Sequence, residues 1–161
     1  MTGLVDILAS SLSLVLLARI AWIDFKTLRI PNRDVLVLTA VASILLIPGV
    51  TSEGWTNLVP AFVLFGLGVL FWLLRAMGAG DAKLFFPLGI LIGFQGMVIF
   101  ALGLLPFSLI FLLLTRLAKR GLTGQGAVSL RLAEIAAGRG IPYGVPMALA
   151  AALAIVFRLT A

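Results

Sequence analysis

Residues 81–117 of this 161-residue chain read DAKLFFPLGILIGFQGMVIFALGLLPFSLIFLLLTRL. Between Lys83 and Arg116 this stretch contains no charged residue. A helix that crosses a bilayer needs about 20 apolar residues, so the stretch is long enough for more than one crossing. Over the whole chain 62% of residues are hydrophobic, 11% are charged, and the mean hydropathy is +1.23. These values predict an all-α integral membrane protein.

Apolar runs of the same kind recur along the chain and predict about six transmembrane helices in a single polytopic domain, residues 1–161. Several runs are shorter than a bilayer requires, so they must tilt, borrow flanking residues or begin inside the protein. Gly93-Phe94-Gln95-Gly96 predicts a tight hairpin between the fourth and fifth spans, with one longer helix as the alternative. The six spans cover residues 4–23, 34–47, 58–74, 82–94, 97–117 and 142–157.

Most of the 12 Lys and Arg residues fall in three connections, which share one side of the membrane if the spans alternate. By the positive-inside rule that side is cytoplasmic, so we expect both termini to be non-cytoplasmic. The net charge of +6 is explained by this orientation and by attraction to anionic lipids. No aromatic-and-basic groove pattern indicates nucleic-acid binding. The connections hold Lys26, Arg29 and Arg33, then Arg75 and Lys83, then Arg116, Lys119, Arg120, Arg131 and Arg139.

The chain has no cysteine and no histidine, which excludes thiolate nucleophiles, zinc sites that use these ligands, and serine–histidine catalysis. Two aspartates remain in chemically suggestive places: Asp24 ends the first span and Asp81 begins the fourth. Both fall on the cytoplasmic side. An ionisable residue at membrane depth is costly and by default indicates function. For Asp34, in the first turn of the second helix, helping to start that helix is the simpler role.

Asp81 lies in the segment Met77-Gly78-Ala79-Gly80-Asp81-Ala82-Lys83. Glycines beside a polar residue allow the backbone to bend or to approach another chain closely. Non-helical backbone at membrane depth is tolerated where it is buried in protein or lines a wet cavity. We therefore expect Gly78-Ala79-Gly80 to be non-helical and able to accept an extended substrate, whereas Gly89 and Gly93 serve helix packing.

Three segments together resemble the type IV prepilin peptidases, membrane aspartic proteases of the GxGD type. Asp24-Phe25-Lys26-Thr27-Leu28-Arg29-Ile30-Pro31-Asn32 is similar to that family's aspartate, basic segment and Ile-Pro-Asn. Residues 78–84, GAGDAKL, are similar to its GxGDxKL, and residues 141–146, IPYGVP, to the entry of its last helix. The chain has neither the cysteines nor the room for the insertion of the bifunctional members. It therefore looks like the compact form associated with Flp-type tight-adherence pili, without the methyltransferase portion.

The resemblance implies a protein of the bacterial inner membrane with several spans, which cleaves prepilins or pseudopilins at the cytoplasmic face. Such substrates carry a short basic leader followed by an N-terminal apolar helix. The expected partners are these substrates and membrane lipids, with no nucleic acid. No cofactor and no metal are expected. The implied catalytic residues are Asp24 and Asp81, and the residues expected to bind substrate or shape the site are Gly78, Gly80, Lys26, Lys83, Pro31 and Asn32.

Two carboxylates in a low-dielectric site should hold one proton between them, so one can act as base and the other as acid. Which aspartate has which role stays open. One alternative is a non-catalytic assembly subunit or small transporter, with the aspartates in ion pairs or a proton path. Another is a serine–lysine peptidase that uses Ser108 or Ser129 with Lys83 or Lys119, although no motif groups these residues.

Overall fold

The computed structural model describes residues 3–121, 126–138 and 141–160. Every regular element within these ranges is helical, which confirms the all-α prediction. The elements in chain order are α1 (Leu4–Thr27), α2 (Asn32–Ser43), the short 3-10 turns η1 (Ile44–Leu46) and η2 (Gly54–Asn57), α3 (Leu58–Leu73), α4 (Ala79–Lys119), α5 (Ala127–Ala137) and α6 (Gly144–Thr160).

Three helical segments of the described chain are long and apolar enough to cross a bilayer: Leu4–Thr27, Gly54–Leu73 and Ala79–Lys119. Helix α6 is apolar but shorter. Their outward surfaces carry many exposed leucine, valine and phenylalanine side chains, such as Leu102 and Leu105 on α4. A surface of this kind is stable against lipid and not against water, which agrees with a membrane protein.

Helix α4 turns back on itself at Gly93, whose backbone (φ 59°, ψ −171°) is not helical. The rings of Phe85 and Phe100 meet edge to face with centroids 6.1 Å apart, whereas a straight helix would separate these residues by about 22 Å. The expected reversal within residues 93–96 is therefore present. It joins two arms of one element, and no loop intervenes. We call residues 79–92 the first arm and residues 94–119 the second arm of α4.

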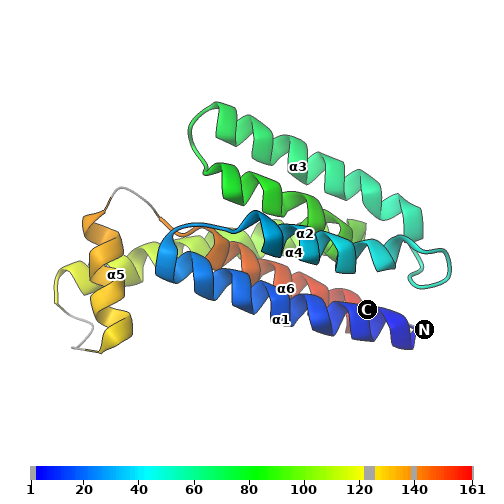
Figure 1. Ribbon diagram of the computed structural model, residues 1–161, viewed down its shortest axis with the longest axis horizontal. Coiled ribbons are helices and arrows are strands. Elements are labelled where there is room, and N and C mark those ends of the chain that lie inside the picture. The colour runs from blue at the N-terminus through cyan, green and yellow to red at the C-terminus, as the bar shows by residue number, and fades with distance from the viewer. Residues whose placement is uncertain (1–2, 122–125, 139–140, 161) are drawn as a thin grey trace.

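The first arm packs against α3, and the second arm runs beside α6 (Figure 1). Helix α1 contacts α6 and α2, so the first and last helices of the chain are neighbours. Small residues allow these close approaches: a Cβ at Gly89 would lie 2.3 Å from Ala61 Cα. The packing role expected for Gly89 is confirmed.

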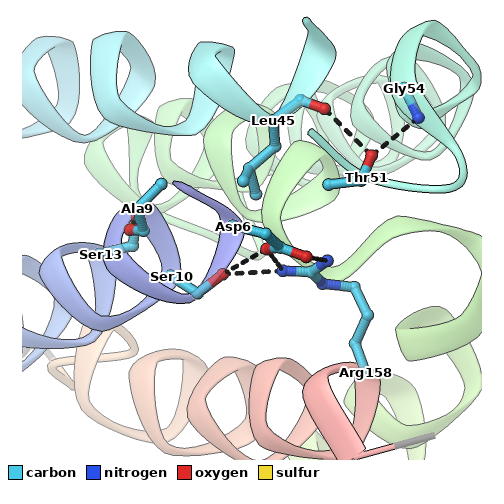
Figure 2. A network of polar contacts seen from close by, with 8 residues as sticks. All are labelled: Asp6, Ala9, Ser10, Ser13, Leu45, Thr51, Gly54 and Arg158. Carbon is cyan, nitrogen blue, oxygen red and sulfur yellow. Dashed lines mark hydrogen bonds and ion pairs between the residues drawn. The ribbon is translucent and has the colours of Figure 1, made fainter. Parts of the chain in front are cut away.

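At the end of the bundle near the N-terminus, Asp6 of α1 forms a buried ion pair with Arg158 of α6 (Figure 2). The guanidinium donates to both carboxylate oxygens, at 3.0 and 2.7 Å, and also to Ser10 Oγ at 2.8 Å. Figure 2 also shows the nearby turn in which Thr51 links Leu45 to Gly54. The pair ties the first helix to the last at the end opposite Asp24.

Candidate active site

Asp24 lies in the last turn of α1, and the residue is 4% exposed. The helix ends because Leu28 adopts a left-handed conformation (φ 54°), from which its N–H bonds Asp24 O at 2.7 Å. Arg131 of α5 then donates to the carbonyls of Phe25 and Lys26, which the end of the helix leaves without helical partners. Asp24 is thus held on a helix end that α5 fixes through Arg131.

Asp81 lies in the first turn of α4 and is 8% exposed. Gly78 precedes the helix in an extended conformation, and the helix begins at Ala79. The expectation that Gly78-Ala79-Gly80 is non-helical throughout is wrong, because Ala79 and Gly80 already form the first turn. Gly80 is small for a different reason: a Cβ there would lie 3.2 Å from Ile30 Cβ in the α1–α2 connection.

Both carboxylates line one cavity of about 530 Å³. Its walls are formed mainly by the α1–α2 connection, the α3–α4 connection, the start of α4 and the segment that leads into α6. The chain therefore brings Asp24 and Asp81 together, as expected, from helices far apart in sequence. The lining residues are Asp24, Leu28, Arg29, Ile30, Asn32, Arg75, Ala76, Met77, Gly78, Ala79, Gly80, Asp81, Lys83, Ile141 and Tyr143.

The carboxylate of Asp24 accepts a hydrogen bond from the backbone N–H of Gly144, at 2.9 Å from Oδ2. Gly144 is the first residue of α6, and a Cβ there would come within 2.7 Å of the same oxygen. The start of α6 thus accepts the carboxylate only because residue 144 has no side chain. Neither Asp24 nor Asp81 forms an ion pair with a cation of the described chain.

The other expected site residues divide into two groups. Gly78, Gly80, Lys83 and Asn32 line the cavity, and Lys83 Nζ donates to Asn32 Oδ1 at 3.1 Å. Lys26 and Pro31 do not line it. Instead Lys26 Nζ lies 4.5 Å from the centre of the Trp22 ring, and Pro31 precedes the first residue of α2.

Sequence reasoning missed several residues of the cavity wall. Leu28 and Arg75 are the non-glycine residues of the described chain with positive φ, and both line the cavity. Backbone strain of this kind concentrates at functional sites. A positive φ is not predicted from the sequence at a leucine or an arginine, however. Tyr143 and the Gly144 N–H lie in the IPYGVP segment, so that motif was the available signal.

The remaining acidic side chains that the structure describes lie outside this cavity. Asp34 Oδ1 is 3.4 Å from Arg19 Nε, and Glu134 pairs with Arg131 at 2.9 Å. No cluster of three or more His, Cys, Asp or Glu that could hold a metal occurs among the described residues. The cavity therefore offers two buried carboxylates, the cations Arg29, Arg75 and Lys83 on its wall, and room for a peptide segment.

Two buried carboxylates that share a cavity and have no ion-pair partner among the described residues define a site suited to acid–base chemistry. The model of the type IV leader peptidase family matches residues 11–116, which include both aspartates. The chain belongs to the type IV leader peptidase family. It is therefore a membrane protein of a peptidase family. No match was found among curated proteins or solved structures.

Proposed function

We propose that this protein is an aspartic endopeptidase that removes the basic leader from type IV prepilins or pseudopilins at the cytoplasmic membrane face. Membership of the leader peptidase family supports the substrate class. The observation that carries the chemistry is the placement of Asp24 and Asp81, buried and without ion-pair partners, on one cavity. An ion-pair role would require a partner cation, and neither carboxylate has one in the described chain.

In the proposed reaction the two aspartates share one proton. The ionised carboxylate takes a proton from a water molecule, whose oxygen forms a bond to the scissile carbonyl carbon. The protonated partner donates its proton to the carbonyl oxygen, which gives a neutral tetrahedral diol. In the collapse of the diol, the carboxyl that took the proton from water gives it to the leaving nitrogen, the other carboxylate takes the proton of one diol hydroxyl, and the C–N bond breaks. The step consumes one water and leaves the pair with one proton, as at the start.

The proposed topology places the cavity end of the bundle in the bacterial cytoplasm. Arg29, Arg75 and Lys83 surround the cavity, and a basic end is retained on the cytoplasmic side. In this arrangement α1, α2 with η1, α3, the two arms of α4 and α6 are the membrane-embedded segments. Helix α2 has 12 residues, or about 18 Å of rise, so it crosses only part of the hydrocarbon core.

The test is a prepilin cleavage assay with membranes that contain Asp24→Asn or Asp81→Asn. Each change preserves the size of the side chain and removes its ability to carry a proton between water and peptide, so we expect cleavage to be abolished. Asp34→Asn is the matched control, because Asp34 is also buried but lies outside the cavity. We call Asp24 and Asp81 the dyad, and substantial processing by either of these two variants would exclude this chemistry. If the protein were instead a transporter, prepilin cleavage would not require the wild-type chain.

The proposed chemistry uses carboxylates and water alone. Strong chelators, serine-directed acylating reagents and thiol reagents should therefore leave the cleavage rate unchanged. Serine acylation tests the serine–lysine alternative directly, and of its four residues only Lys83 lines the cavity. Loss of cleavage after chelation, with recovery on addition of zinc, would contradict the proposal.

A further inference from the structure

A second, apolar groove runs along the second arm of α4 and shares two wall residues with the cavity that holds the dyad. Its volume is about 480 Å³, and four of its lining residues are leucines. Ile141 and Tyr143, in the segment that leads into α6, line both the groove and the dyad cavity. The groove residues are Ala101, Leu104, Leu105, Ser108, Leu109, Leu112, Ile141 and Tyr143.

We propose that this groove receives the apolar helix of the substrate and that Ile141 and Tyr143 form the junction between helix and scissile segment. The inference rests on the proposed function and adds to it the surface that selects the substrate. The shared wall carries it, because Ile141 and Tyr143 line both spaces and the groove therefore lies next to the dyad cavity.

The wall is polar on the cavity side of Ile141 and Tyr143 and apolar on the groove side, which is the order of polar and apolar segments in the substrate. On one side lie the two carboxylates and the small residues Gly78, Ala79 and Gly80, which suit a polar, extended segment. On the other side the wall consists of leucines with Ala101 and Ser108, which suits an apolar helix. A substrate of the proposed class is polar around the cut and apolar after it.

The dimensions also fit a helical occupant. Positions 101–112 rise by about 16 Å, which corresponds to roughly three helical turns. Ala101 and Ser108 lie on the same face of the arm, two turns apart, and small side chains allow a second helix to approach closely. The groove would therefore hold the first three turns of the substrate helix after the cut.

The positive charge on the wall of the dyad cavity makes an apolar binding surface necessary. Arg29, Arg75 and Lys83 line the dyad cavity and would repel a basic leader. Binding free energy for such a substrate must then come mainly from its apolar part, and the groove offers an apolar surface that shares Ile141 and Tyr143 with the site.

The first test places the photoreactive amino acid p-benzoylphenylalanine at Leu105, in an Asp81→Asn background that keeps the prepilin uncleaved. Ile110 is the control position, since it is 52% exposed against 71% for Leu105 and lies about 140° further around the same arm. We expect crosslinks from Leu105 to the apolar helix of the prepilin and none from Ile110. Crosslinks to lipid alone at both positions, or equal crosslinks to prepilin from both, would overturn the proposal.

The second test compares Ser108→Phe, which fills the groove, with Ile110→Phe, which adds the same ring elsewhere on the arm. We expect Ser108→Phe to lower kcat/KM for the full prepilin by roughly tenfold, the effect of losing about 1.4 kcal/mol. Cleavage of a short peptide that lacks the apolar helix should not change. An equal loss with both substrates, or no loss with either, would contradict the groove assignment.

The two proposals can fail separately. If the wild-type enzyme cleaves prepilin and depends on both aspartates, but Leu105 gives no crosslink to the substrate, the groove assignment alone is wrong. If the wild-type enzyme cleaves no prepilin, the proposed function is wrong, whatever the crosslinks show.

Discussion

Asp24 is held by a backbone contact that a single methyl group would disturb. The Gly144 N–H donates to its carboxylate, and a Cβ at residue 144 would approach the same oxygen to 2.7 Å. Gly144→Ala should therefore displace the carboxylate. Because a displacement of about 1 Å can reduce a rate by roughly 100-fold, we expect kcat for prepilin cleavage to fall by about that factor, with KM changed much less.

Gly66→Ala is the control for this change, because a Cβ at Gly66 meets no atom within 4 Å. Both kcat and KM of Gly66→Ala should match those of the wild type. A Gly144→Ala enzyme with wild-type kcat would show that the hydrogen bond from Gly144 does not position a reacting group.

Gly80 and Gly89 are both small for packing reasons, but at different places. A side chain at Gly80 would press on Ile30 in the wall of the cavity, whereas one at Gly89 would overlap the backbone of α3. We expect Gly80→Val to reduce cleavage per folded enzyme strongly while most of the protein still folds. Gly89→Val should instead lower the yield of folded protein. Cleavage rates and size-exclusion profiles in detergent measure the two effects, and equal specific activities of the folded fractions would contradict the difference.

At the scale of elements, the reversal of α4 depends on Gly93. Its backbone (φ 59°, ψ −171°) lies in a region that essentially only glycine adopts, and it costs about 1–3 kcal/mol for a residue with a side chain. A Cβ would also overlap Glu53 Oε2, the atom that accepts the N–H of Phe94 at 3.3 Å. Gly93→Ala should therefore lower the free energy of unfolding by more than the backbone cost alone, measured by thermal or denaturant unfolding in detergent.

Gly121 separates the two contributions to that loss. It has a φ of 72°, and a Cβ there would meet no atom within 4 Å. Gly121→Ala should thus show the cost of a positive φ without any overlap. If Gly93→Ala and Gly121→Ala destabilise the protein equally, the contact with Glu53 contributes nothing to the turn.

At the scale of the whole molecule, the Asp6–Arg158 pair ties the first helix to the last at the end far from the dyad. Breaking a buried ion pair by removing one partner costs about 3–5 kcal/mol, because the other charge stays buried. Arg158→Met should therefore destabilise the fold by roughly this amount. The double change Asp6→Leu with Arg158→Met should recover most of the loss, since replacing both partners by apolar residues is often near neutral.

The same variants should leave the chemistry intact. Asp6 and Asp24 are separated by about 27 Å of helix, so the cleavage rate per folded enzyme should be unchanged in the double variant. Unfolding in detergent gives the stabilities and the prepilin assay gives the rates. A double variant that is as unstable as Arg158→Met, or one that is folded but inactive, would contradict this separation of roles.

The sequence by itself determined the class of the protein and reduced the number of candidate chemistries. Long apolar segments indicate burial in lipid, where helices satisfy their own backbone hydrogen bonds. The all-α membrane fold therefore followed from the residue types alone. With no cysteine and no histidine, the candidates were reduced to carboxylates or a serine–lysine pair. Asp24 and Asp81 could be selected because helix ends and glycines are local features, which hydropathy and spacing reveal.

Contacts between distant segments were decided only by the tertiary structure. The packing of the helices decides whether Gly80 is helical, which backbone N–H contacts Asp24, and which wall Tyr143 forms. That packing depends on pairs of residues far apart in the chain. The Asp6–Arg158 pair joins residues 152 positions apart, and neither residue carries a local signal of its partner. The same holds for the groove that Tyr143 lines, because a concave surface exists only after several helices have been placed against one another.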